Sequence, residues 1–152
     1  MKILEVYQKI QNIRERIETL DEDYKDLCEA AEKLLNMLSA KCKTEKLPPR
    51  EYDLTEHLYI IFDDDHDCIR LEPSRPYSLR EEILGTMGLD YRVDEDGEVA
   101  AAFYIIDHAP EILERLDEVE KELAKEDERV RRALDKLKES IGMLALAKRV
   151  ER

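Results

Sequence analysis

Apolar residues recur in alternating steps of three and four along the first 38 residues. They stand at Ile3, Val6, Ile10, Ile13, Ile17, Leu20, Tyr24, Leu27, Ala31, Leu34 and Leu38. This spacing is the a/d pattern of a heptad repeat, and no Gly or Pro interrupts it. A helix with so narrow an apolar stripe cannot bury the stripe alone, so it needs a partner helix. We expect a coiled-coil helix that runs to about Lys46, because Pro48 and Pro49 cannot continue it.

A second apolar stripe predicts another long helix at the other end of the chain. Its members are Ile112, Leu116, Val119, Leu123, Val130, Leu134, Leu137, Ile141 and Leu144. Asp107 or Ala109 is expected to cap this helix, with Pro110 in its first turn. The two helices have similar lengths, so the simplest arrangement is an antiparallel hairpin in which each buries the stripe of the other. In that register paired residue numbers sum to about 154, which sets Ile10 beside Leu144.

The middle of the chain has the pattern of a small α+β head. Residues 58–62 are rich in β-branched and aromatic residues, and residues 68–72 alternate between apolar and polar. The acidic residues 63–67 stand between them, so we expect a β-hairpin with an acidic turn.

The rest of the head is expected to be a short helix followed by a second hairpin. Ser78 and Glu81 have the spacing of a capping box, which predicts a helix that runs to about Thr86. Residues 89–93 and 98–106 are interpreted as two strands, with Gly97 supplying a positive φ angle between them. The predicted fold is therefore α+β: residues 1–47 and 109–152 form the antiparallel coiled coil, and residues 52–107 form a ββαββ head.

Composition restricts the partners and the compartment. The chain has 25 Lys and Arg against 38 Asp and Glu, a net charge of −13, so phosphate backbones and anionic membranes should repel it. Its three cysteines form no CxxC pair, and the N-terminus has no signal-peptide pattern, which favours a reduced, cytoplasmic protein. Many charges and few side-chain amides are typical of heat-adapted proteins.

Two regions are more apolar than a two-helix coiled coil requires. In the first helix the surplus includes Leu35 and Met37, close to the predicted head. In the last helix residues 141–147 are apolar nearly all round. Contiguous exposed apolar patches usually mark interfaces. The predicted partner-binding residues are Leu35, Met37, Ile141, Met143, Leu144 and Leu146.

No motif indicates catalysis, so the chain is not expected to be an enzyme or to hold a cofactor. The acidic turn could bind Mg²⁺ or Ca²⁺ through Asp63, Asp65, His66 and Asp67, although it lacks the glycine and distal Glu of a full calcium loop. His66 and Cys68, with His57 or His108, could ligate zinc, but their spacing is not diagnostic. We expect no metal site.

The predicted order of helix, strands and helix resembles the prefoldin chaperone family, whose subunits are coiled-coil hairpins rooted in β-strands. The helix expected at residues 78–86 departs from that plan. Our first hypothesis is a non-enzymatic assembly protein that forms a homodimer or larger oligomer through its helical hairpin and meets another protein. The resemblance implies an alternative, a holdase that offers its apolar tip to unfolded clients. A metal-binding protein that uses the acidic turn is the third hypothesis.

Overall fold

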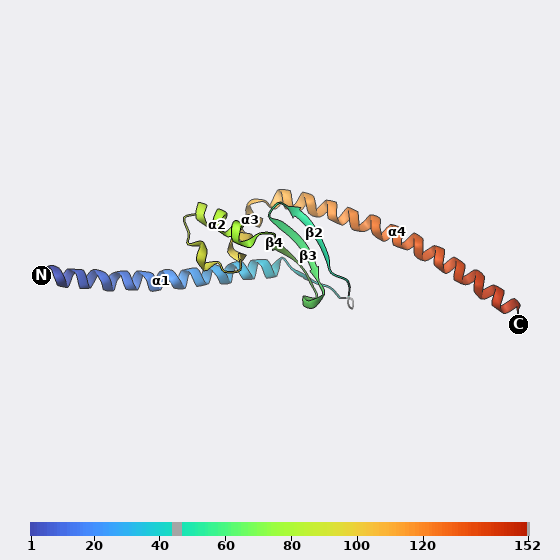
Figure 1. Cartoon of the computed structure of the whole chain (residues 1–152), viewed down its shortest axis with the longest axis horizontal. Helices are drawn as coiled ribbons and strands as arrows, with labels where there is room; N and C mark the ends of the chain where they lie inside the picture. Colours follow the sequence, from blue (N-terminus) through green and yellow to red (C-terminus); the bar gives the residue numbers. More distant parts are fainter. Residues whose placement is uncertain (44–46, 152) are drawn as a thin grey trace. The chain divides into compact units, whose positions relative to one another are not determined.

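The computed structural model describes residues 1–43 and 47–151 (Figure 1). The chain forms two units, Met1–Ile112 and Leu113–Arg152. The first contains the N-terminal helix and the whole head, and the second consists of the rest of the C-terminal helix. The protein is therefore a mixed helix-and-sheet fold with long helices at both ends, as the sequence predicts.

Helix α1 spans Lys2–Met37 and is shorter than predicted. The expected end, Lys46, lies outside the described residues. The helix ends earlier because strand β1, Ala40–Lys41, leaves the helical path to pair with β4. The N–H of Cys42 also donates to the carbonyl oxygen of Asp67. Pairing with a distant strand thus ends the helix before Pro48 and Pro49 are reached.

The sheet is antiparallel, with strand order β1-β4-β3-β2. Strands β3, Leu58–Asp63, and β4, Cys68–Pro73, form the predicted hairpin, and a 3-10 turn at Asp64–His66 lies between them. Strand β2, Arg50–Thr55, pairs with β3 and was not anticipated. Its sequence is largely polar and charged, so it carries little of the apolar alternation that marks a strand.

Helix α2 spans Pro76–Thr86 and ends where the sequence predicts. The capping-box interpretation was wrong, because the helix begins two residues before Ser78 and Arg75 stands at the N-cap without a side-chain cap. Pro76 at the first position suits a helix start, since its missing N–H needs no partner there. At the other end Gly88, with φ of +75°, lets the chain turn away.

The predicted second hairpin does not form, and residues 98–107 instead make helix α3, Glu98–Asp107. Residues 91–93, expected to be a strand, form a 3-10 turn. The Asp94 carboxylate accepts from the N–H groups of Val99, at 3.0 Å, and Ala100, at 3.0 Å. These bonds satisfy donors at the start of a helix. A buried helix and a buried strand show the same apolar run, and this cap favours the helix.

The core of the head lies where α1, α2 and α3 meet. Ala31 of α1, Leu84 of α2, and Val99 and Ala102 of α3 form one buried cluster. In this cluster Leu84 of α2 lies against Ala102, one of three consecutive alanines of α3. Small side chains on α3 let α1 and α2 approach closely on two of its sides.

Helix α4 spans Ala109–Val150, with Pro110 in its first turn as predicted. Among the described residues, no helix is both long enough and apolar enough to cross a membrane. The pairing of α1 with α4 in a hairpin stays a prediction. Around Ala31 the apolar stripe of α1 is already covered by α2 and α3, so this part of the stripe is not free to pair with α4.

Candidate interaction surfaces

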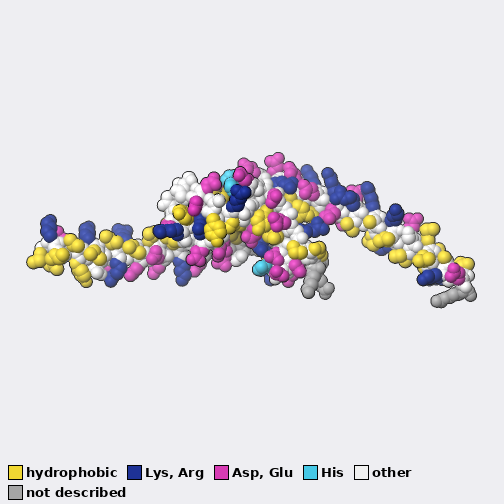
Figure 2. All heavy atoms as spheres, in the orientation of Figure 1, with side chains coloured by type: hydrophobic (Ala, Val, Ile, Leu, Met, Phe, Trp, Pro, Cys, Tyr) yellow, Lys and Arg dark blue, Asp and Glu magenta, His cyan; other side chains and the backbone are white. Residues whose placement is uncertain are grey.

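The first half of the α1 stripe is open. Six seam residues have side chains that are 52–66% exposed, and we call them the open seam: Ile3, Val6, Ile10, Ile13, Ile17 and Leu20. Figure 2 shows hydrophobic side chains following this part of the helix. No other described residue of unit 1 covers them. The open seam is therefore a continuous apolar surface about five helical turns long.

The head covers the second half of the same stripe. The N–H of Asp90 donates to the hydroxyl of Tyr24 at 2.8 Å, and this bond marks where cover begins. Beyond it, Ala31 is only 6% exposed, and Leu27 and Leu34 pack against the same cluster. The stripe is thus one surface, half of which already serves to bind the head.

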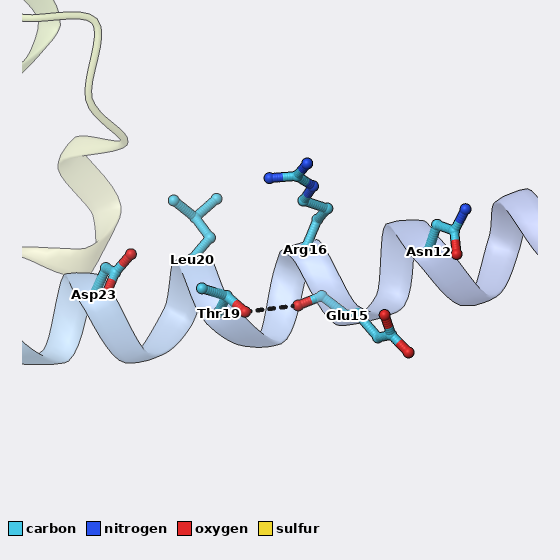
Figure 3. Close-up of a pocket in the computed structure, with 6 residues that line it drawn as sticks. All are labelled: Asn12, Glu15, Arg16, Thr19, Leu20 and Asp23. Atoms are coloured by element: carbon cyan, nitrogen blue, oxygen red, sulfur yellow. Dashed lines mark hydrogen bonds between the residues drawn. The ribbon is translucent and has the colours of Figure 1, made fainter.

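A shallow hollow borders the open seam on α1. It is lined by Asn12, Glu15, Arg16, Thr19, Leu20 and Asp23 (Figure 3). All six residues belong to one helix, so the hollow is open surface and not an enclosed site. The side chains of Arg16 and Leu20 point to the same side of α1, whereas Glu15 points the opposite way (Figure 3).

Helix α4 carries a second open stripe. The described part of unit 2 contains no other element that could cover this distal seam, and its members are exposed: Val130, Leu134, Leu137, Ile141 and Leu144. At 100° per residue, Met143, Leu146 and Val150 lie on the opposite face of the helix and form a separate tip patch. The tip therefore has two apolar faces that point in opposite directions.

The predicted partner-binding residues fall in different surroundings. Ile141, Met143, Leu144 and Leu146 are all about two-thirds exposed on α4, divided between the distal seam and the tip patch. On α1, Met37 is 73% exposed and Leu35 is half-buried beside a cavity under β4. Their role in binding a partner stays a prediction.

Charge is distributed unevenly along the chain, a feature that the total of −13 hides. Residues 21–128 hold 32 Asp and Glu against 13 Lys and Arg. Residues 129–150 hold seven Lys and Arg against two Asp and Glu, and residues 2–20 hold four against three. The open apolar surfaces thus lie on the two segments that lack the acidic excess of the rest.

The acidic turn is held together by its own side chains. Asp63 accepts from the N–H of Asp65 at 2.9 Å, and its Oδ2 lies 3.0 Å from His66 Nδ1 and 3.1 Å from Arg70 Nη2. These contacts, chiefly the bond from Arg70, hold the pKa of Asp63 below its usual value. In residues 1–43 and 47–151, no group of three or more His, Cys, Asp or Glu side chains is placed to hold a metal ion.

A second acidic cluster lies between α1 and the start of α3. Cys28 donates to the carbonyl oxygen of Val93 at 3.6 Å, and burial, then Asp94, Glu98 and Glu95, raises the pKa of its thiol. Burial, followed by the charge of Glu32, also raises the pKa of Glu98. A raised pKa lowers the share of the reactive thiolate form, whereas a catalytic cysteine needs that share to be high.

Two histidines predicted as possible zinc ligands meet around one tyrosine. The Tyr104 ring stacks on His108 with centroids 4.1 Å apart, and His57 meets its edge at 5.6 Å. The Tyr104 hydroxyl donates to Thr55 Oγ1 at 2.8 Å. His57 Nδ1 is buried and, among the described residues, has no hydrogen-bond partner. The two imidazoles therefore pack against the ring of Tyr104.

His57 and His108 come from a strand end and a helix junction 51 positions apart. Their meeting could not be predicted from spacing. His66 lies at the opposite end of the β3–β4 hairpin from His57, which directly precedes β3, so the proposed set of zinc ligands is not assembled.

Compared with known protein families, curated proteins and solved structures, the chain shows no significant match.

Proposed function

We propose that this chain is a non-enzymatic assembly protein, and that two copies associate through the distal seams of α4 in an antiparallel coiled coil. The main support is that unit 2 is a single helix with five exposed seam residues at heptad spacing. A long helix with such an apolar stripe is stabilised in water when another helix covers the stripe. A second copy always supplies a matching helix, because the same seam is present on it.

The spacing of the distal seam fits a two-fold antiparallel pair. With the axis beside residue 139, Leu134 meets Leu144 of the other copy and Leu137 meets Ile141. Each contact then occurs twice, as an isologous interface requires. Along one edge of the seam stand Ala133, Ser140 and Ala147, whose small side chains let the two helices approach closely.

Charge opposes self-association of this chain, so the apolar seam must drive it. Two copies of the acidic region, residues 21–128, repel each other, and so do two copies of residues 129–150, which carry a net positive charge. Within the α4 pair, Lys138 also lies opposite its own copy across the axis. These repulsions are screened by salt, so added salt should tighten the dimer.

Light scattering of the full chain on a sizing column tests this proposal. We expect a mass of twice 17.9 kDa for the wild type and a monomer for Leu137→Glu, which buries a charge in the seam. Met143→Glu places the same charge on the opposite face and should remain a dimer. Circular dichroism shows that each variant is folded. A monomeric wild type, or a Leu137→Glu variant that stays dimeric, would contradict the proposal.

The competing arrangement is the hairpin of α1 with α4 expected from the sequence. It would set Ile10 beside Leu144, so Ile10→Glu would lower the melting temperature. Association through α4 alone leaves both the mass and the melting temperature of Ile10→Glu unchanged. One variant therefore separates the two pairings.

The tip patch favours a second candidate function, a holdase that binds unfolded clients. An α4 pair leaves Met143, Leu146 and Val150 uncovered, because they lie opposite the distal seam. Slower aggregation of a model client, abolished by Met143→Glu and Leu146→Glu while the dimer persists, would support this function. If the variants slow the aggregation of the client as much as the wild type does, the tip patch is not the binding surface.

A further inference from the structure

The edges of the open seam are basic, although the chain as a whole is acidic. In the heptad of α1, the positions beside the seam are occupied by Lys2, Tyr7, Lys9, Arg14 and Arg16. The acidic residues of the same segment, Glu5, Glu15 and Glu18, occupy outer positions of the heptad. Figure 3 shows this separation for Arg16 and Glu15. The edge residues change to Asp21 and Asp23 where the head begins to cover the stripe.

These cations have few attachments of their own. Lys2 and Arg14 make exposed ion pairs with Glu5, at 3.6 Å, and Glu18, at 4.0 Å, within the same helix. Such exposed ion pairs contribute little to stability, so either cation can readily pair with a partner's carboxylate instead. Lys9 and Arg16 make no ion pair within the described part of the chain. All four charges are therefore available to a partner that lies along the seam.

We propose that the open seam binds an amphipathic helix of another protein whose own apolar stripe is flanked by Asp and Glu. Charges beside the seam set partner choice in coiled coils. Every basic edge residue would meet an acidic one whether the partner runs parallel or antiparallel. The partner segment would be about five turns long, to match residues 2–20.

The same edge charges disfavour the helices that this chain could supply. A second open seam would set Lys9 beside Arg14 or Arg16 of the other copy. The distal seam of α4 is flanked by Arg131 and Lys138, so it would also bring like charges together. The proposed partner is thus a different protein, and its site is separate from the α4 dimer.

Two synthetic three-heptad peptides test this inference on the full-length protein. Both carry Ile and Leu at the seam positions; one has Glu and the other has Lys at every flanking position. By fluorescence anisotropy, we expect the Glu peptide to bind at least about tenfold more tightly than the Lys peptide. The affinity of the Glu peptide should fall as salt is added. The double variant Lys9→Glu/Arg16→Glu should reverse the preference, and Ile10→Glu should abolish binding.

The matched control is Lys25→Glu/Lys33→Glu, which makes the same change of charge at exposed positions of α1 away from the seam edges. It should keep the preference for the Glu peptide. Equal affinity for both peptides, or no binding of either, would overturn the proposal. Binding to phosphatidylglycerol vesicles without a preference for the Glu peptide would overturn it in favour of a lipid surface.

The outcome is independent of self-association through α4. The Lys9→Glu/Arg16→Glu variant should keep the wild-type mass, and Leu137→Glu should still bind the Glu peptide. Opposite responses to salt separate the two further, because salt tightens the α4 dimer and weakens the peptide complex.

Discussion

The N–H of Asp90 donates a 2.8 Å hydrogen bond to the hydroxyl of Tyr24, and this contact divides α1 into an open half and a covered half. On one side of Tyr24 the apolar stripe is exposed as far as Ile3. On the other side it packs against α2 and α3. One polar atom on a seam residue thus fixes the edge of the head on a stripe that is otherwise uniformly apolar.

Tyr24→Phe should therefore destabilise the head without changing the helix. The N–H of Asp90 loses its acceptor, and the expected cost is about 1 kcal/mol of unfolding free energy. Denaturant unfolding measures it. Tyr7→Phe is the matched control, because Tyr7 is 61% exposed on the open half of the same helix and should show no change. Equal effects of the two substitutions would argue against the role assigned to Tyr24.

Two glycines should respond to alanine with opposite signs. Gly97 has φ of +73°, and an added Cβ would lie 2.8 Å from Pro76 Cβ, so Gly97→Ala should cost about 1–3 kcal/mol. Gly85 lies inside α2 with open space around it, so Gly85→Ala should stabilise the fold by about 0.5–1 kcal/mol. Thermal melting of the two variants tests both predictions. If both substitutions shift the melting temperature in the same direction, the prediction is wrong.

Asp94→Ala should loosen the start of α3. The carboxylate is 3% exposed, and two N–H groups depend on it, so the expected loss is about 2 kcal/mol. Asp96→Ala removes the same charge from an exposed neighbour and should change stability little. Melting temperature measured side by side distinguishes a cap from a general effect of negative charge.

Glu98→Gln should stabilise the protein at neutral pH and have no effect in acid. Burial raises the pKa of Glu98 in the folded state above its ordinary value near 4.5, so ionising it weakens the fold as the pH rises. Below that value the carboxyl is protonated in both states, and the variant should match the wild type. Melting temperature against pH measures this, with Glu22→Gln on the exposed surface of α1 as control.

Sequence reasoning predicted elements whose own residues specify them. The stripe of α1, the β3–β4 hairpin, the end of α2 and the start of α4 all follow from local periodicity, turn residues or proline. It was wrong about residues 98–106, because an apolar run buried on several sides has no period to separate strand from helix. The cap that makes it a helix lies in the preceding loop, at Asp94.

The candidate surfaces also divide into those that local sequence predicts and those that depend on distant residues. Leu144 and Ile141 could be identified as members of an apolar stripe because their spacing is local and regular, and both are exposed in the structure. The cluster of His57, Tyr104 and His108 could not be predicted, because it depends on how a strand end meets a helix junction.

By itself, the sequence determined that two long helices carry apolar stripes and that a small mixed head separates them, because heptad spacing is a property of consecutive residues. Only the tertiary structure decided which part of the first stripe is in use. The head buries Ala31 and leaves Ile10 open, although both occupy the same heptad position. Burial depends on what folds back onto a residue, and no local pattern records that.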